Sequence, residues 1–407
     1  MRKYGIFMMA VILLVGLFSA CSAEDRKVGD NTAINVDNFN DQGDEKKVNN
    51  KNKNNENNGI QNEDKKEKLK IVTTIFPEYD WAMNILGEKA ADADVTMLLD
   101  TGVDLHSYQP TVDDILKISS CDVFIYVGGE SDAWIEDALK EATNKNMIVV
   151  NLLECLGDNV KEEEMVEGMQ EHDHDHEDAD DHDHEDANDY DHEDADDHDH
   201  EDANDHDHED ADDHDHEDVD DHDHEDEEPE YDEHVWLSLR NASVLVESIT
   251  EALLKADAEN ADIYKNNAAS YIRKLKELDT EYQKTVSEAS FHTLLFGDRF
   301  PFRYLVDDYG IDYYAAFVGC SAETEASFET ITFLAKKVDE LSLPVVMTIE
   351  GTDHRIAETI VQSTKTKDQQ VLAIDSMQSV TGKDVQEGAT YLSIMEKNLS
   401  VLKEALK

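Results

Sequence analysis

The sequence predicts an α/β protein of two lobes, each with a parallel four-stranded sheet flanked by helices, joined by a long rigid helix. Two separate series of short, nearly continuously apolar runs alternate with helical patterns. Such runs are typical of parallel strands that are covered on both faces. A helical stretch at 241–289 separates the two series. Because ligands of open parallel sheets bind beyond the carboxyl ends of the strands, we expect a ligand site in the cleft between the lobes.

The first series predicts strands at 70–75, 94–99, 122–128 and 147–152, and helices at 79–87, 111–120 and 131–144. Thr111 and Ser131 are suitable helix N-caps, and Gly87 is suitable as a C-terminal stop. The stretch 260–289 contains no Gly or Pro, and one continuous helix there would span about 45 Å. The second series predicts strands at 292–298, 312–319, 345–351 and 371–375, and helices at 302–309, 327–341, 352–364 and 388–406.

The amino-terminal segment has the pattern of a bacterial lipoprotein signal. A positively charged start precedes an apolar run at 6–18, which is short for a membrane span. The small residues Ser19 and Ala20 directly precede Cys21. We therefore expect a lipid on Cys21 that holds the protein at the outer face of the cell membrane. The alternative is a plain secretory signal with an incidental cysteine.

A strongly acidic tract dominates the charge of the chain. Residues 171–230 hold 36 of the 97 acidic residues and no Lys or Arg, and the net charge of the whole chain is −62. Nucleic acid is excluded as a partner, because its binding needs a basic surface. Cations are the natural partners of such a field.

The same tract is rich in histidine. Seven octads of the type HDHEDADD follow one another from His174, and 14 of the 18 histidines lie between positions 172 and 224. Imidazole and carboxylate suit zinc and other divalent metals. A chain this polar loses conformational entropy when it closes around an ion, so it should bind many ions weakly. The alternative is an acidic spacer without function. The expected low-affinity metal loop contains His174, His176, His182, His184, His198, His200, His206, His208, His214, His216, His222 and His224.

The expected domain organisation follows from these patterns. It comprises a signal peptide (1–21), a disordered tether (22–68), an N-terminal lobe (69–240) that includes a disordered insert (161–232), linking helices (241–289) and a C-terminal lobe (290–407). Cys121 would begin one strand and Cys155 would follow the end of the next, so we expect no disulfide between them.

Four residues far apart in the chain are candidates for one specific metal site. His106 follows a strand, and His234 precedes the helical stretch. Asp298 and Asp375 stand at the ends of the first and last strands of the second series. Two imidazoles and two carboxylates suit a four-coordinate divalent metal. Each of these residues also has an ordinary structural explanation as a loop residue, helix cap or ion-pair partner. The backup ligand candidates are Glu350, Cys320 and His354.

The residues around these candidates carry a family resemblance. VDLHSYQPTVDDI, followed by CDVFIYVGGESDAWIEDAL, resembles the first metal-ligand motif of the solute-binding lipoproteins of zinc and manganese ABC importers (cluster A-I). EHVWLSLRNA, GDRFPFRYLVDDYGI and AIDSM resemble the second, third and fourth motifs, and GCSAETEAS stands where the family has a Glu-containing segment. The resemblance covers about residues 69 to 407, apart from the acidic insert.

The resemblance implies two α/β lobes with a metal ion between them, held by His106, His234, Asp298 and Asp375. The third position is a departure, because the family more often has His there in zinc proteins and Glu in manganese proteins. A carboxylate favours manganese, whereas a histidine-rich loop before the second ligand is typical of zinc-selective members.

The predicted function is an extracytoplasmic receptor that captures Zn²⁺ and delivers it to the membrane permease of an ABC importer. We expect a monomer with no enzymatic activity. The alternatives are a Mn²⁺ receptor of the same family and a surface adhesin or metal-buffering lipoprotein. A metal-dependent hydrolase is disfavoured, because the chain has no HExxH motif.

Overall fold

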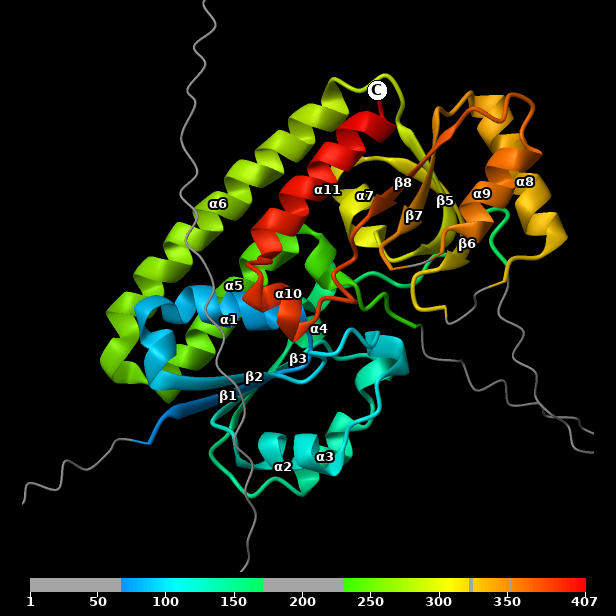
Figure 1. Cartoon of the computed structure of the whole chain (residues 1–407). Coiled ribbons are helices and arrows are strands. Elements are labelled where there is room, and N and C mark those ends of the chain that lie inside the picture. The colour runs from blue at the N-terminus through cyan, green and yellow to red at the C-terminus, as the bar shows by residue number, and fades with distance from the viewer. Residues whose placement is uncertain (1–66, 171–229, 322–324, 352) are drawn as a thin grey trace, which may run out of the picture. The chain divides into compact units, whose positions relative to one another are not determined.

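The strands of the computed structural model form two parallel four-stranded sheets, one from each predicted series (Figure 1). The structure describes residues 67–170, 230–321, 325–351 and 353–407. Cys21, the tether and the histidine octads lie outside the described residues, so the predictions for them stay predictions. All eight predicted strands are confirmed, with ends that differ by a few residues.

The first sheet has the strand order β2-β1-β3-β4. In Figure 1, helices α1 and α5 lie on one of its faces and α2 and α3 on the other. Thr111 caps α2, and Gly87 ends α1 with a positive φ of 56°, as predicted. The elements of this series are β1 (Leu69–Thr73), α1 (Phe76–Leu86), β2 (Ala93–Met97), α2 (Val112–Ser120), β3 (Val123–Tyr126), α3 (Ile135–Lys140), β4 (Ile148–Asn151) and α4 (Leu152–Leu156), with short 3-10 helices η1 (Gly87–Asp92), η2 (Leu105–Ser107), η3 (Glu130–Asp132) and η4 (Gly157–Asn159).

Two local predictions in this series were wrong. Ser131 does not cap a helix, because it lies inside η3 and α3 begins only at Ile135. The predicted strand at 147–152 ends one residue early, because Asn151 caps α4 by accepting a hydrogen bond from the Glu154 backbone. A helix of five residues is too short to produce a readable periodic pattern.

The second sheet has the strand order β6-β5-β7-β8. Helices α8 and α9 lie on one side of it, and α7 and α11 on the other (Figure 1). The four predicted helices are confirmed, and the short α10 is an addition. The elements are β5 (Thr293–Phe300), α7 (Arg303–Tyr309), β6 (Asp312–Val318), α8 (Phe328–Leu341), β7 (Val345–Ile349), α9 (Arg355–Ser363), β8 (Gln370–Ile374), α10 (Gly382–Gln386) and α11 (Tyr391–Ala405).

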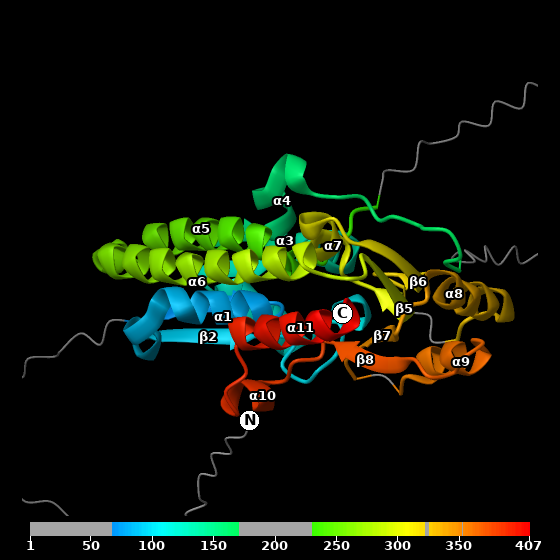
Figure 2. The ribbon, with the colours of Figure 1, turned by 90° about the horizontal axis from the view of Figure 1, so that it is seen from above.

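The linking stretch consists of two helices, α5 (Leu239–Ala256) and α6 (Ala261–Ser287), separated by the short η6 (Ala258–Asn260). They lie side by side in both views (Figures 1 and 2). The 27 residues of α6 correspond to about 40 Å. This helix packs against α1 of the first lobe and against α7 and α11 of the second. The predicted strut between the lobes is therefore present.

Buried aromatic side chains join the two lobes beside α6. The ring of Trp81 in α1 contacts the ring of Tyr391 in α11 edge-on, at a centroid distance of 5.2 Å. The Tyr391 hydroxyl donates to the backbone oxygen of Trp236 at 2.6 Å, and the Trp236 indole donates to the Ser376 backbone oxygen at 2.8 Å. All three rings are fully buried, so one continuous core fixes the segment around Trp236 against both lobes.

The described residues that flank the acidic tract lie against the second lobe. Residues 161–163 pair with 230–232 through an antiparallel bridge and two flanking backbone hydrogen bonds of 2.9 Å. Lys161 forms an ion pair with Asp307 of α7 at 2.7 Å. The backbone N–H of Gln170 donates to the Ala316 oxygen of β6 at 2.9 Å. We call the paired residues 161–163 and 230–232 the clasp.

Two further observations concern cysteines and membranes. Cys121, Cys155 and Cys320 are free thiols, so the expected absence of a bond between the first two is confirmed. Among the residues that the structure describes, no helix has the length and apolar character needed to cross a membrane.

The core around Tyr391 yields a stability prediction. Tyr391→Phe removes the hydroxyl that satisfies the buried Trp236 carbonyl, and should lower the free energy of unfolding by about 1–3 kcal/mol. Urea unfolding followed by circular dichroism measures the change. Tyr231→Phe is the matched control, because Tyr231 is 48% exposed and its change should stay within about 0.5 kcal/mol. Equal losses in both variants would contradict the assigned role of the Tyr391 hydroxyl.

Candidate metal centre

His234 lies at the start of η5 (Val235–Leu237), and its side chain is fully buried. One carboxylate oxygen of Asp232 accepts hydrogen bonds from the His234 backbone N–H at 2.8 Å and from its ring Nδ1 at 3.0 Å. An ionised carboxylate can only accept, so the neutral ring carries its proton on Nδ1. The Nε2 lone pair of His234 is therefore free to bind a cation.

His106 approaches from the loop between β2 and α2, within η2. The Asp104 carboxylate accepts from its backbone N–H at 3.0 Å. Its Nδ1 is 2.8 Å from the Ser131 hydroxyl and 3.5 Å from the Glu233 carboxylate. Its Nε2 is 3.1 Å from Nε2 of His234. When Ser131 accepts the Nδ1 proton, two imidazole lone pairs point toward the same place.

Cys320 completes this cluster from the end of β6. One ligand atom each of His106, His234 and Cys320 lies within 4.8 Å of the other two. Within the described ranges of the chain, this is the one group of three or more His, Cys, Asp or Glu side chains placed to share a metal ion. Gly319 allows the approach: a Cβ there would lie 2.9 Å from the Phe300 carbonyl oxygen and 3.1 Å from Cε1 of His234.

The cluster disfavours protons on His106. Burial, together with the nearby His234 ring, lowers the pKa of His106 to about 3. Burial also acts to lower the pKa of His234, but the adjacent Asp232 charge and hydrogen bond outweigh it and raise that pKa. Burial raises the pKa of the Cys320 thiol. The neutral form of His106 is the form that binds a metal.

The structure does not bring Asp298 into this cluster. The pairing of β5 with β6 shifts register between Phe296 and Arg299, a bulge that contains Asp298. Bulges redirect side chains. Asp298 accepts a 2.6 Å hydrogen bond from the Thr348 hydroxyl and a 3.3 Å bond from the Ile349 backbone. The strand also continues to Phe300, so Asp298 lies within it and not at its end.

Asp375 follows β8 as predicted but is also outside the cluster. Its carboxylate accepts from the Met377 backbone N–H at 2.8 Å. Burial, with a contribution from the charge of Glu350, raises its pKa to about 6. Glu350 itself accepts from the backbone N–H and the hydroxyl of Ser376, at 2.7 and 2.8 Å.

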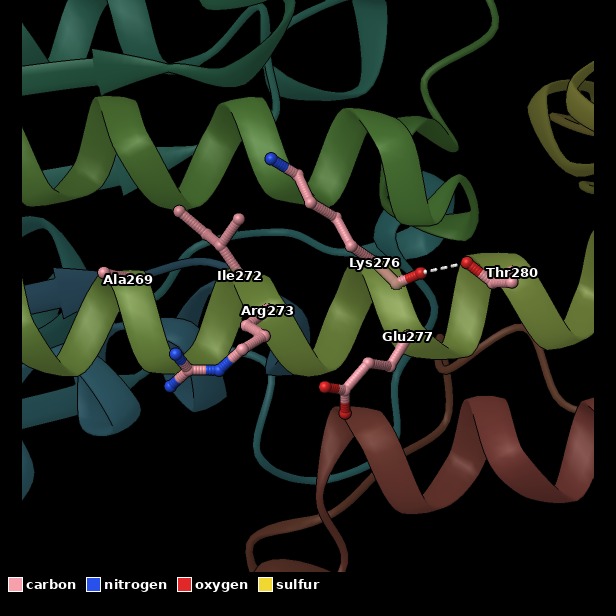
Figure 3. Close-up of a pocket in the computed structure, with 6 residues that line it drawn as sticks. All are labelled: Ala269, Ile272, Arg273, Lys276, Glu277 and Thr280. Carbon is pink, nitrogen blue, oxygen red and sulfur yellow. Dashed lines mark hydrogen bonds between the residues drawn. The ribbon is translucent and has the colours of Figure 1, made fainter.

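A hollow of about 430 Å³ lies beside the cluster. Asp298 and the backup candidates Glu350 and His354 line it from the second lobe, and Asp104 lines it from the first. A second hollow, about 360 Å³, lies on the surface of α6 and is lined by that helix alone. In Figure 3 the side chains of Lys276 and Glu277 point to opposite sides of α6. That surface hollow brings no residues of the two lobes together.

Three contacts join the segment 100–104 of the first lobe to the second lobe next to the first hollow. Asp104 forms an ion pair with Arg299 of β5. Thr101 pairs with Thr381 in an isolated antiparallel bridge, and the Gly382 N–H donates to the Asp100 oxygen at 2.7 Å. Burial alone would raise the pKa of Asp104, but Arg299 and His106 outweigh it and hold that pKa below its usual value. The loop that carries His106 is therefore held against the second lobe.

Sequence reasoning missed the residues that orient the two imidazoles. Asp232 was hidden among the many carboxylates of the adjoining acidic tract. Asp104, two residues before His106, resembles any helix cap. Glu233 and Ser131 meet only in the folded chain, where the Ser131 N–H donates to the Glu233 carboxylate at 2.9 Å. An Asp two residues before each histidine is the one signal that the sequence offered.

The sequence is similar to zinc-binding and zinc-uptake proteins over most of its length. The zinc-binding protein AdcA of Streptococcus pyogenes is 30% identical over 340 residues, which cover 83% of this chain and 56% of that protein. This chain thus spans about half the length of the first curated relatives it matches. The high-affinity zinc uptake system protein ZnuA of Bacillus subtilis is 26% identical over 342 residues, or 84% of this chain and 89% of the relative.

Solved structures agree with the fold. The Zn(II)-bound ZnuA-like domain of Streptococcus pneumoniae AdcA superposes with a TM-score of 0.57 at 24% identity, covering 83% of this chain and 99% of the domain. The metal-dependent lipoprotein YcdH of Bacillus subtilis gives a TM-score of 0.59 at 23% identity, and the superposition covers 84% of this chain and 100% of the YcdH chain. These likenesses confirm the two-lobed α/β fold.

The family model described as ZnuA, zinc-uptake complex component A periplasmic, matches residues 71–405. This range includes both sheets, the linking helices and the His106–His234–Cys320 cluster. The match confirms the resemblance found in the sequence motifs: the chain belongs to the periplasmic component A family of zinc-uptake complexes.

Proposed function

We propose that this chain is an extracytoplasmic receptor that captures Zn²⁺ and delivers it to the permease of an ABC importer, without changing the ion chemically. The observation that carries the proposal is the pair of imidazoles whose Nε2 atoms face each other at 3.1 Å. Two Zn–N bonds of about 2.0–2.1 Å at a tetrahedral angle place their nitrogens about 3.3 Å apart. Family membership and the names of the zinc-binding relatives support the same cargo.

The surroundings of the imidazoles favour zinc over manganese. Imidazole and thiol are ligands that zinc accepts readily, whereas manganese prefers carboxylate, carbonyl and water oxygen. Asp232 holds the ring of His234 in the binding tautomer, an arrangement typical of metal-binding histidines. The Mn²⁺ alternative would need Asp298 and Asp375 to dominate the site.

Asp298 and Asp375 stay proposed carboxylate ligands. Asp298 lines the hollow beside the cluster, Asp375 directly follows β8, and carboxylate oxygens are ligands that divalent metals accept. Their contribution is separable from that of the imidazoles by single substitutions.

The proposed place of action is the outer face of the cell membrane. The lipoprotein pattern at Cys21 supports a lipid anchor, and the related AdcA of Streptococcus pneumoniae is named a zinc-binding lipoprotein. The proposed partner is the membrane permease of the importer, and the proposed receptor is a monomer. The octads before His234 would collect zinc weakly near the clasp.

Release of the ion requires the lobes to part in this proposal. The Asp104–Arg299 ion pair holds the His106 loop to the second lobe, and Asp104 also binds the backbone of His106. Opening of that contact would therefore withdraw one of the two imidazoles. Contact with the permease is the step expected to supply this change.

Removal of either imidazole should abolish tight binding. We expect His106→Ala and His234→Ala each to lower zinc affinity more than about 100-fold, beyond the loss typical when a residue that only orients a ligand is removed. Competition titration against a chromophoric chelator measures the affinity. His292→Ala is the matched control, because this exposed histidine lies outside the cluster. Unchanged affinity in both cluster variants would refute the site.

Asp232→Asn should lower zinc affinity about 10–100-fold, because the amide no longer fixes the Nδ1–H tautomer of His234. The same titration measures the loss. Asp307→Asn is a suitable control: it weakens the Lys161 ion pair of the clasp and should leave zinc affinity unchanged. Equal effects of the two substitutions would indicate general loosening of the clasp.

Deletion of residues 171–229, which leaves the clasp intact, should leave one tightly bound zinc ion per chain and remove the weakly bound ions, because weak binding is expected of the polar octads. Metal analysis after dialysis, followed by titration, counts both classes. Loss of the tight ion would place the specific site in the acidic tract.

A further inference from the structure

We propose that the thiolate of Cys320 is the third ligand of the zinc site and the residue that selects zinc over manganese. The proposal rests on the proposed receptor function. It places a thiolate in the ligand position that the sequence motifs assigned to the carboxylate of Asp298. It is carried by the cluster of His106, His234 and Cys320, whose ligand atoms lie within 4.8 Å of one another.

The backbone around Cys320 holds its side chain at this place. The residue follows β6, and the backbone N–H of Ser321 donates back to the Val318 oxygen at 3.4 Å, which closes a turn. The carboxylate of Glu163 accepts from the Cys320 N–H at 3.0 Å. Glu163 belongs to the clasp, whose opposite strand leads directly to Asp232 and His234. The clasp therefore helps to position both Cys320 and His234.

The three ligands come from three separate parts of the chain. His106 belongs to the first lobe, His234 to the segment directly before α5, and Cys320 to the second lobe. Asp298 in the second lobe is held by Thr348 and the Ile349 backbone. Cys320 is thus the second-lobe side chain that reaches the two imidazoles, and a shared ion would tie the lobes together.

The other described cysteines are poorly placed for this role. The Cys121 thiol is buried and lies 3.4 Å from the Met147 sulfur. Cys155 lies in α4 near Ser248 of α5. Neither belongs to the cluster. A thiolate signal from a bound metal would therefore identify Cys320.

The chemistry explains the selectivity. When zinc enters, a Zn–S bond of about 2.3 Å forms, and the thiol proton leaves to solvent. Thiolate is a soft ligand that suits zinc, whereas manganese favours hard oxygen ligands. A site of two imidazoles and one thiolate therefore discriminates against manganese, and one of the two proposed carboxylates, Asp298 or Asp375, would supply the oxygen ligand at the fourth position.

Cobalt(II) reports directly on the thiolate. The full chain, carrying Cys21→Ser in every protein, is loaded with one equivalent of Co²⁺. We expect a sulfur-to-cobalt charge-transfer band in the near ultraviolet, which the octads cannot produce because they contain no cysteine. Cys320→Ser should lose this band and keep the visible d–d bands. Cys155→Ser is the matched control and should keep both.

Affinities test the selectivity. Cys320→Ser should bind zinc more than about 10-fold more weakly, with little change for manganese. Cys320→Asp, which restores a negative but hard ligand, should lower the ratio of zinc to manganese affinity further in favour of manganese. Thermal unfolding of the metal-free variants, expected to match the parent protein, shows that the fold is intact.

Two results separate the proposals. If the parent chain binds zinc tightly but shows no charge-transfer band, or if Cys320→Ser retains both the band and the zinc affinity, the ligand assignment is overturned and the receptor function stands. If the parent chain binds no zinc tightly, the receptor function itself fails. A misfolded Cys320→Ser variant leaves the parent spectrum and Cys155→Ser to decide the assignment.

Discussion

The hydrogen bond between Asp232 and the ring of His234 is the constraint on which the rest of the site depends. It turns a buried imidazole so that its Nε2 lone pair faces His106. Asp232 is itself held by the clasp, through its N–H bond to the Lys161 oxygen, and by Tyr304, whose hydroxyl donates to its backbone oxygen at 2.8 Å. The His234 side of the polar centre is therefore held in place by the clasp and by Tyr304.

The molecule combines a rigid frame with one adjustable contact. Trp81, Trp236 and Tyr391 form a continuous buried core between the lobes, and close-packed cores resist gradual deformation. The Asp104–Arg299 ion pair lies at the other side of the metal centre, and both side chains are partly exposed there. Because the aromatic core includes neither Asp104 nor Arg299, the His106 loop would move by breaking this ion pair while the core stays intact.

The sequence predicted the fold well because its eight strands are short, mostly apolar runs separated by clear helical patterns, an alternation that is typical of parallel sheets. His106 and His234 were chosen as candidates because a histidine that follows a strand or precedes a helix is conspicuous, and the structure places their rings side by side. Asp298 was favoured over Cys320 because its motif resembles a ligand motif, but side-chain direction in β5 depends on a bulge. A bulge is set by packing against β6 and β7, and periodicity carries no record of it. For the same reason, the contact between Ser131 and His106 could be seen only in the folded chain.

The clasp has a consequence for the evolution of the acidic tract. Because residues 161–163 and 230–232 are paired beside the metal centre, the intervening chain leaves and returns at neighbouring points. The entropy of closing such a segment rises only with the logarithm of its length, so each doubling costs about 0.6 kcal/mol. Octads can therefore be duplicated or deleted with little effect on the folded lobes. The number of octads can change in this way without altering the backbone pairing of the clasp beside His234.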